Sequence, residues 1–334
     1  MSGRIVLAVD GGNSKTDLAL VSAEGDALAL VRGPRSTPQY LGTDGCLEVL
    51  ERLLEDAVRQ GGLTRQAGPI ADVAELLLAG VDFPADEREL EEAAAKRGWA
   101  TMTRVANDTF AVLRAGTERG WGVAVVCGSG INCVGVAPDG SHARFPSLGA
   151  ITGDWGGGYD VGLAAVVAAA RSEDGRGPTT SLERAVPAHF DLAAPHELAE
   201  AIHRERIPQR QIIELAPVVF AEAGEDEVAR GIVDRLSSEI AALVRVALTR
   251  LELTSEPTEV LLGGGLLQSG DGRLLDSVRA ELEQVGAELT IRATSSAPIV
   301  GAALLGLDAL GATSDAKARV RDSLAAAATT ESVE

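Results

Sequence analysis

Alternating apolar and polar positions at the start of the chain predict three short strands joined by tight turns. These strands are expected at residues 4–9, 16–21 and 27–31. From 44 to 60, leucines recur at helical spacing and a Gly-Gly pair follows, which is typical of an amphipathic helix and its end. Strands at 74–78 and 103–106 then alternate with a charged helix at 86–97, so we expect a mixed sheet with helices on its faces.

The opening pattern recurs in the second part of the chain. An apolar strand at 122–126, a glycine turn, a returning strand at 132–136 and an Asp-Gly turn repeat the order of the N-terminus. A recurrence of this length indicates duplication of one α/β unit. The pattern then favours helices and one more strand; the helices are expected at 161–170, 196–204, 209–223, 227–251 and 298–310, and the strand at 259–262.

A chain of 334 residues is long enough for two domains of ordinary size. We expect a first domain over 1–115 and a second over 116–310, whose last helix is able to pack back on the first. Residues 311–334 are Ala-rich and polar and are expected to form a frayed tail. With 46% apolar and 24% charged residues, the composition is that of a folded globular protein.

Charge and cysteine content argue against several partners and compartments. Lys and Arg number 30 and Asp and Glu 49, a net charge of −19 that repels nucleic acid and anionic membranes. No apolar run approaches the roughly 18 residues that span a bilayer, and the first one is too short for a signal peptide. Cys46, Cys127 and Cys133 are too few and too irregularly spaced for a disulfide framework or a zinc site, and they are expected to be buried thiols. We therefore expect a cytoplasmic protein with no nucleic-acid or membrane partner.

The turn after the first strand carries the first candidate chemistry. It is the run Asp10-Gly11-Gly12-Asn13-Ser14-Lys15-Thr16. Glycine amides together with the Ser, Lys and Thr donors can hold a phosphate, and Asp10 can bind Mg²⁺ through water. A simple hairpin turn explains the same residues. The loop leads into an alternating strand rather than a helix, which excludes both the dinucleotide-binding fingerprint and the Walker loop.

Two further glycine clusters lie in the second half of the chain. The turn Gly128-Ser129-Gly130 occupies the matching place in the repeated unit, so the two loops could hold the β- and γ-phosphates of a nucleotide from opposite sides. Gly263-Gly264-Gly265 ends a buried strand and would let the backbone lie against an adenine ring, although a strand-to-helix turn also uses glycine.

Five motifs occur in the order seen in the actin/hexokinase/Hsp70-like ATPases. They are Asp10-Gly-Gly-Asn-Ser-Lys-Thr, Asn107-Asp108, Gly128-Ser-Gly-Ile-Asn132, Gly153-Asp154-Trp-Gly-Gly-Gly158 and Gly263-Gly-Gly265. Within that group the chain resembles the BadF/BadG/BcrA/BcrD ATPase family, which includes the N-acetylglucosamine kinases, from about residue 4 to about residue 310. The resemblance implies an α/β fold of two ribonuclease-H-like domains, with mixed sheets flanked by helices and with MgATP and substrate in the interdomain cleft.

Asn107 and Asp108 close a predicted strand and precede a helix expected at 109–115. Both residue types are favoured helix N-caps, which is the structural interpretation. In the kinases that this segment resembles, an Asp at this place is the catalytic base. The resemblance therefore implies that Asp108 accepts the proton of the attacking hydroxyl and that Asn107 contacts the substrate. Asp82, after the strand at 74–78, either lines the same cleft or belongs to a turn.

The resemblance also implies sugar contacts. Asp154 matches the sugar-binding Asp of a Gly-Asp-Glu-Gly-Ser motif whose Glu is replaced here by Trp155, and Asn132 matches an Asn that contacts substrate. The N-acetylglucosamine kinases usually have an Asn in the segment around 38–39. Because this chain lacks it, Thr37 or Gln39 is expected to take over that contact. The difference leaves the 2-substituent of the sugar open.

The predicted function is an ATP-dependent kinase that transfers the γ-phosphate to the 6-hydroxyl of an amino sugar, with N-acetylglucosamine favoured. Glucosamine, N-acetylmuramic acid and N-acetylmannosamine remain alternatives. The same family includes ATP-driven activators of radical dehydratases or reductases, which hold an iron–sulfur cluster through paired cysteines that this chain does not place suitably. A sugar-sensing repressor would need a helix-turn-helix extension, for which we expect no room. Relatives are often dimers, which is the basis for considering a homodimer.

Overall fold

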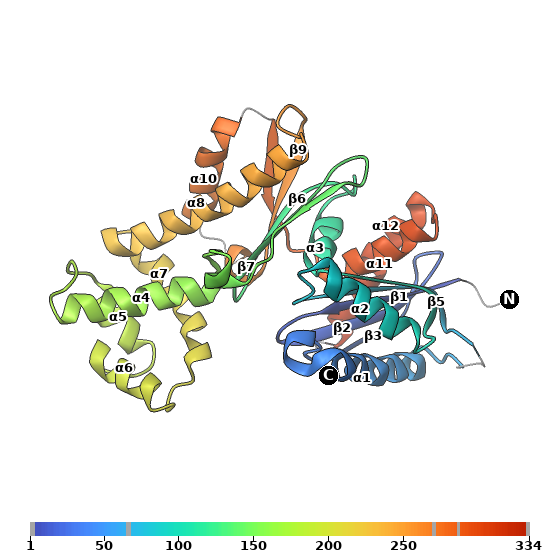
Figure 1. The fold of residues 1–334 in the computed structure, drawn as a ribbon, viewed down its shortest axis with the longest axis horizontal. Coiled ribbons are helices and arrows are strands. Elements are labelled where there is room, and N and C mark those ends of the chain that lie inside the picture. Colours follow the sequence, from blue (N-terminus) through green and yellow to red (C-terminus); the bar gives the residue numbers. More distant parts are fainter. Residues whose placement is uncertain (1–3, 65–67, 269–271, 286–287, 332–334) are drawn as a thin grey trace. The chain divides into compact units, whose positions relative to one another are not determined.

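The computed structural model describes residues 4–64, 68–268, 272–285 and 288–331. The chain forms two compact units (Figure 1). The first consists of Met1–Trp121 and Ser295–Glu334, and the second of Gly122–Thr294. Over the described residues, each unit is built on one five-stranded sheet.

The sheet of the first unit has the strand order β3-β2-β1-β4-β5. Its strands are β1 (Ile5–Gly11), β2 (Lys15–Ser22), β3 (Ala27–Pro34), β4 (Ala71–Leu78) and β5 (Ala100–Ala106). β1, β2 and β3 are antiparallel neighbours, whereas β4 and β5 run parallel to β1. The β1–β2 register pairs Asp10 with Asp17 and Gly11 with Thr16, and the turn that follows is the first glycine loop.

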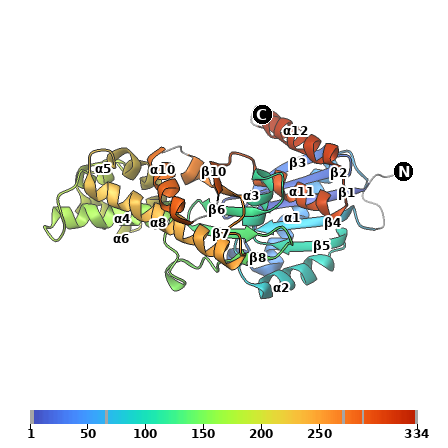
Figure 2. The same cartoon turned by 90° about the horizontal axis from the view of Figure 1, so that it is seen from above.

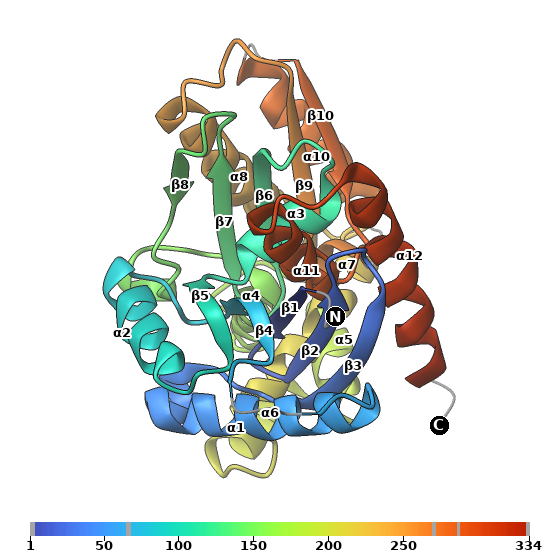
Figure 3. The ribbon, with the colours of Figure 1, turned by 90° about the vertical axis from the view of Figure 1, so that its right-hand side faces the viewer.

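Helices cover both faces of this sheet (Figure 3). They are α1 (Pro38–Gln60), α2 (Pro84–Ala95), α3 (Thr109–Gly116), α11 (Pro298–Ala309) and α12 (Ser314–Glu331). β1 shows why the sheet needs two layers, since its alternate side chains enter different cores. Ile5, Leu7 and Val9 pack in the core with α1 and α2, while Val6 and Ala8 pack in the core with α11 and α12.

A glycine brings α11 close to α3. A Cβ at Gly301 would lie 1.8 Å from the carbonyl oxygen of Ala111, so only glycine permits this approach. Because α3 begins directly after Asp108, the contact helps to fix where that residue lies.

The sheet of the second unit has the order β10-β9-β6-β7-β8. Its strands are β6 (Gly122–Cys127), β7 (Ile131–Val136), β8 (His142–Arg144), β9 (Thr258–Gly263) and β10 (Leu289–Ala293). β6, β7 and β8 are antiparallel neighbours, whereas β9 and β10 run parallel to β6. This repeats the pattern of the first sheet and supports the duplication inferred from the sequence. The predicted α/β architecture of two mixed sheets flanked by helices is thereby confirmed.

Helices and short turns complete the second unit. The α-helices are α4 (Gly157–Glu173), α5 (Leu182–Ala188), α6 (Pro195–His203), α7 (Ala216–Glu222), α8 (Glu227–Arg250), α9 (Gly265–Gln268) and α10 (Gly272–Leu282), and the 3₁₀ turns are Gly149–Ile151, Gln209–Leu215 and Glu283–Val285. Asp226 caps α8 by accepting a hydrogen bond of 2.8 Å from the Ala229 amide. α8 packs along β6 and β7 (Figure 2).

The structure draws the domain boundaries differently from the sequence expectation. The division falls after Trp121 rather than after residue 115, and the chain returns to the first unit at Ser295. The expected frayed tail is the helix α12, which contributes Val320 and Leu324 to a buried core. Its apolar positions are few and separated by alanines, which explains why the sequence pattern did not reveal its buried face.

Several elements of the second unit differ from the expectation in detail. The segment expected as one helix at 209–223 is a 3₁₀ turn followed by α7, which has Pro217 in its first turn. Strands β8 and β10 and helices α5 and α10 were not expected. β8 has only three residues and all five residues of β10 lie partly or fully exposed, so neither carries a strong apolar signal.

Membrane and cysteine expectations can be compared with the described residues. None of the helices in this part of the chain is both long and apolar enough to cross a bilayer. Cys46, Cys127 and Cys133 are free thiols and all three are buried, as expected.

Candidate active site

The first glycine loop joins β1 to β2. The Gly12 amide closes the turn by donating to the Lys15 carbonyl at 2.9 Å. Thr37, which is fully buried, holds the loop from outside: its Oγ1 lies 3.0 Å from the Gly12 carbonyl and 2.9 Å from Asn13 Oδ1. The hydroxyl predicted to contact the sugar is therefore engaged by the loop.

The side chains of this loop divide into buried and exposed sets. Thr16 is fully buried and its Oγ1 donates to Ser36 Oγ at 2.8 Å, so its hydroxyl is used inside the unit rather than offered as a phosphate donor. Asn13, Ser14 and Lys15 are exposed. Ser14 and Lys15 remain available as donors to an anion.

Asp17 lies buried behind the loop and is paired with cations. Arg32 donates to its carboxylate through Nε at 2.6 Å and Nη2 at 3.0 Å, and Lys15 Nζ lies 3.4 Å away. The Lys15 side chain itself is 54% exposed, so its ammonium stays within reach of solvent. This pairing was not identified from the sequence, because nothing local connects Asp17 with the following strand.

Asp10 stands near the end of β1 and is partly exposed. The pKa of its carboxyl is raised to about 8, mainly by burial and also by the charges of Asp108 and Asp17, while Lys15 and Arg32 act in the opposite direction. A carboxylate in such surroundings is stabilised when a cation binds beside it.

Asn107 and Asp108 connect β5 to α3, and their side chains have different roles. Asn107 is buried; its Oδ1 accepts hydrogen bonds from the Thr109 amide at 3.0 Å and from Thr109 Oγ1 at 2.6 Å. Its Nδ2 donates to Asp82 Oδ1 at 3.0 Å. Asn107 thus caps α3, and the side chain of Asp108 makes no capping hydrogen bond. The predicted substrate contact of Asn107 is replaced by a structural one.

Asp108 as a whole residue is partly exposed. Burial raises its pKa to about 6 and the charge of Asp82 raises it too, while the backbone amides of Asp108 and Thr109 lower it. Asp10 lies near the carboxyl end of β1, and Asp82 and Asp108 follow the carboxyl ends of β4 and β5; the three strands are parallel neighbours in the sheet. Ligand sites of parallel sheets lie at this edge.

Gln39 joins the same group of residues. Its Nε2 donates to Asp82 Oδ2 at 3.3 Å. Both residues line a cavity of about 310 Å³ in the first unit. The predicted site residue Gln39 is therefore connected to Asn107 through Asp82.

The second glycine loop joins β6 to β7 and packs against the start of α4. The Gly158 amide donates to the Gly128 carbonyl at 2.8 Å, and the Tyr159 amide donates to the Ser129 carbonyl at 3.0 Å. A Cβ at Gly128 or Gly130 would meet no atom within 4 Å, so a ligand can approach this backbone closely.

The third glycine cluster adjoins the second. Gly264 has φ +91°, and a Cβ there would lie 2.4 Å from the Cys127 carbonyl oxygen. The sequence-predicted clusters 128–130 and 263–265 are therefore neighbours in the second unit, at the carboxyl ends of β6 and β9.

The predicted sugar contacts Asp154 and Asn132 lie near the same loop. The Thr152 hydroxyl donates to the Asp154 carboxylate, and the Cys133 amide donates to Asn132 Oδ1 at 2.7 Å. Asp154 lines a cavity of about 160 Å³ together with Trp155. The Trp155 ring is stacked by the guanidinium of Arg235, whose Cζ lies 4.0 Å from the ring centroid.

The donor set suits a magnesium ion that arrives with a nucleotide. No group of three or more His, Cys, Asp or Glu side chains suitable for a metal occurs within the described ranges, so these residues form no dedicated protein cage. Mg²⁺ is usually held by one or two carboxylates, water and substrate phosphates. Asp10, with its raised pKa and its neighbouring anionic charges, fits that role.

Comparison with known proteins extends over nearly the whole chain. The sequence profile of the BadF/BadG/BcrA/BcrD ATPase family matches residues 7–306. An N-acetylmuramic acid/N-acetylglucosamine kinase of Clostridium acetobutylicum is 27% identical over 270 residues, which are 80% of this chain and 86% of the relative. An N-acetyl-D-glucosamine kinase of Dictyostelium discoideum is 25% identical over 320 residues, which are 92% of this chain and 99% of the relative.

Solved structures agree with this assignment. A Chromobacterium violaceum protein, provisionally assigned as an N-acetylglucosamine kinase, has a TM-score of 0.71 at 27% identity, over 92% of this chain and 100% of the other. A ROK family glucokinase from Streptomyces griseus has the same fold, with a TM-score of 0.52 at 16% identity, over 92% and 98% of the two chains. Since the family profile extends from β1 to α11, the chain belongs to the BadF/BadG/BcrA/BcrD ATPase family.

Proposed function

We propose that this protein is an ATP-dependent kinase that transfers the γ-phosphate of ATP to the 6-hydroxyl of an amino sugar, with N-acetylglucosamine as the favoured substrate. The observation that carries the proposal is the Asp108 carboxylate. Asp108 is a partly exposed residue, and its carboxylate makes no capping hydrogen bond because Asn107 caps the helix. The two curated relatives, both kinases of N-acetylated amino sugars, support the same conclusion.

Asp108 acts as the general base for the acceptor hydroxyl. A pKa of about 6 leaves it mostly ionised at neutral pH while making it more basic than an ordinary aspartate. Such a value lies closer to the operating pH, where general bases are most effective. Phosphoryl transfer depends mainly on positioning and charge stabilisation, so a single well-placed carboxylate is sufficient at the acceptor.

Glycine loops account for the proposed nucleotide binding. In the first unit the loop that contains Gly11 and Gly12 binds terminal phosphate oxygens through the Ser14 and Lys15 donors. In the second unit the exposed backbone at 128–130 does the same, and 263–265 binds the adenosine. Mg²⁺, held by Asp10 through water, would neutralise charge on the phosphates.

Hydrogen bonds select the sugar. Asp154, Asn132 and Gln39 are the polar side chains that we assign to its hydroxyls and 2-substituent. A site that pairs each substrate hydroxyl discriminates strongly against analogues that lack one, because its buried polar groups then lose their partners.

A coupled assay of ADP release tests this function. The purified protein would be incubated with MgATP and, separately, N-acetylglucosamine, glucosamine, N-acetylmuramic acid, N-acetylmannosamine and glucose. We expect strong stimulation by N-acetylglucosamine and a 6-phosphate product by NMR. The absence of stimulation by every sugar would disprove the kinase proposal, and a preference for another amino sugar would correct the substrate.

A further inference from the structure

Asp82 lies in the loop between β4 and α2, and both of its carboxylate oxygens are occupied. Oδ1 accepts from Asn107 Nδ2 at 3.0 Å, and Oδ2 accepts from Gln39 Nε2 at 3.3 Å. Its own amide donates to Asp86 Oδ2 at 3.2 Å, at the start of α2. One residue thus connects α2, the start of α1 and the β5–α3 junction.

The carboxylate of Asp82 determines which way the Asn107 amide faces. An ionised carboxylate only accepts hydrogen bonds, so it selects the NH₂ end of the amide. The carbonyl end is then directed to Thr109, where it accepts from both the amide and the hydroxyl. The reversed amide would place a donor against the Thr109 N–H, and the cap would be lost.

The cap decides the state of Asp108. The Asn107 carbonyl takes up the first amide of α3, and Asp108 makes no capping bond of its own. If Asn107 reversed, Asp108, whose carboxylate already lies beside the backbone amides of Asp108 and Thr109, would be the nearest side chain able to cap the helix, and its carboxylate would be held there. The charges of Asp10, from β1, and Asp82, from the β4–α2 loop, also surround this group.

We propose that Asp82 is a positioning residue of the phosphoryl transfer: it holds the Asn107 amide in the orientation that caps α3 and so keeps the Asp108 carboxylate directed at the acceptor hydroxyl. This inference rests on the proposed function, in which Asp108 is the base. Asp82 itself touches no reacting atom.

Substitutions at both ends of the Asp82–Asn107 contact test the proposal. Asp82→Ala should lower kcat about 10- to 100-fold, the range for a misplaced catalytic group, and leave KM for sugar and ATP within about twofold. Thr43→Val serves as a matched control, because Thr43 lines the same cavity and its Oγ1 donates to Glu89 Oε1 at 2.7 Å. It should retain the kcat of the wild type.

A reversed pair supplies a rescue experiment. Asn107→Asp alone places two carboxylates against each other and should reduce kcat at least as strongly as Asp82→Ala. Adding Asp82→Asn restores a donor. The NH₂ group of the new amide at position 82 can donate to one carboxylate oxygen at position 107, and its carbonyl can accept from Gln39. The second carboxylate oxygen at position 107 then remains for the Thr109 amide. We expect the double variant to recover at least tenfold in kcat over Asn107→Asp.

The outcomes separate the two proposals. The positioning role would be overturned if Asp82→Ala had the kcat of the wild type, or if the reversed pair were no faster than Asn107→Asp. The role of Asp108 as the base would stand even then, provided that Asp108→Asn lowers kcat. No sugar-stimulated ADP release by the wild type would overturn the kinase function and the positioning role with it. If circular dichroism shows that Asp82→Ala does not fold, the reversed pair decides.

Discussion

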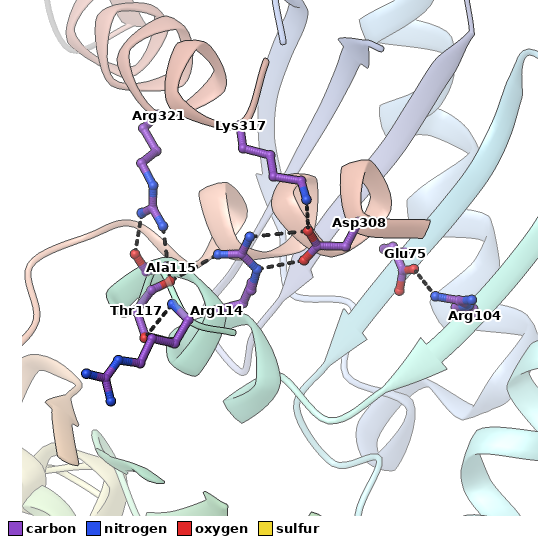
Figure 4. A network of polar contacts seen from close by, with 9 residues as sticks. Glu75, Arg104, Arg114, Ala115, Thr117, Asp308, Lys317 and Arg321 are labelled. Atoms are coloured by element: carbon purple, nitrogen blue, oxygen red, sulfur yellow. Dashed lines mark hydrogen bonds and ion pairs between the residues drawn. The ribbon is translucent and has the colours of Figure 1, made fainter. Parts of the chain in front are cut away.

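Arg114 and Asp308 are 194 positions apart in sequence and form a two-point ion pair (Figure 4). Arg114 Nε lies 2.7 Å from Asp308 Oδ2, and Nη2 lies 3.3 Å from Oδ1. Lys317 Nζ contacts Asp308 Oδ1 at 2.7 Å, and Arg321 donates to the carbonyls of Ala115 and Thr117. The pair therefore links α3, which begins after Asp108, to the returning helices α11 and α12.

Asp308→Ala should destabilise the protein by about 2–3 kcal/mol. The Arg114 side chain is only 7% exposed, so the substitution would leave a buried positive charge without the carboxylate that it pairs with. Breaking a fully buried pair costs about 3–5 kcal/mol, and we expect less because Asp308 is 35% exposed. Denaturant unfolding measures the change. Asp276→Ala, in the exposed pair with Arg279, is the control and should change stability by less than about 0.5 kcal/mol. Equal effects of the two substitutions would contradict this account.

The core of the first unit was accessible from the sequence, whereas the Arg114–Asp308 link was not. Period-two and period-3.6 patterns report which side chains are buried locally, and they located β1, β2, β3, α1 and α3. Arg114 lies in an apolar helix with nothing nearby to suggest a partner. Only the tertiary fold brings α11 beside α3, so long-range ion pairs and the placement of α12 escaped the sequence analysis.

In the candidate site, too, some features follow from local sequence patterns and others depend on tertiary contacts. Glycine-rich turns and an Asn-Asp pair after a strand are local signals, and they are the basis for proposing the loops and Asp108 as site residues. The assignments that differ, Thr16, Thr37 and Asn107, are polar residues whose side chains are consumed by contacts inside the unit. Whether a hydroxyl or amide faces a ligand or a neighbour depends on packing partners that lie far away in sequence, and a single sequence does not specify them.

Glu75 should make the stability of the protein depend on pH. It lies on β4 and is 5% exposed; burial raises its pKa to about 7, although Arg104, with Nη1 3.4 Å from Oε1, opposes the shift (Figure 4). A carboxyl whose folded pKa is raised contributes stability that is complete below its unfolded pKa and is lost as pH rises through the folded value. We expect the free energy of unfolding contributed by this group to fall between pH 4.5 and pH 7.

Glu75→Gln tests this directly. The variant should be more stable than the wild type at pH 8 and show a flatter dependence of the unfolding free energy on pH between 5 and 8. Arg104→Met should do the opposite, because it removes the charge that favours ionised Glu75. Identical pH profiles for the wild type and Glu75→Gln would mean that Glu75 is ionised in the folded protein at ordinary cost.

Gly264→Ala should disrupt the proposed nucleotide site in the second unit. The residue has φ +91°, and a new Cβ would lie 2.4 Å from the Cys127 carbonyl at the base of the second loop. We expect a loss of at least about 2 kcal/mol in stability, from backbone strain of about 1–2 kcal/mol together with the clash. The displaced loop should also raise KM for ATP more than KM for sugar.

A second glycine gives the control for this substitution. Gly231 lies within α8, and a Cβ there meets no atom within 4 Å. Gly231→Ala should therefore leave stability unchanged or raise it by about 0.5–1 kcal/mol, since alanine costs less conformational entropy in a helix. The two variants could instead show the same unfolding free energy and the same KM for ATP. The close approach of the third glycine cluster to the second loop would then not matter for ATP binding.

Asp108→Asn should lower kcat by about 10²–10⁴-fold, the range for a lost general base, and leave the fold intact. The cap of α3 is supplied by Asn107 and not by the Asp108 carboxylate, so the helix should keep its cap in the variant. The substitution also removes a negative charge that raises the pKa of Asp10, so thermal stability should equal or exceed that of the wild type. Steady-state kinetics with a thermal melt measures both effects.

Binding of MgATP and sugar by calorimetry should persist, because the glycine loops and Asp154 are unchanged. A variant that lost stability along with activity would indicate that Asp108 supports α3 structurally, and one with wild-type kcat would remove it from the reaction.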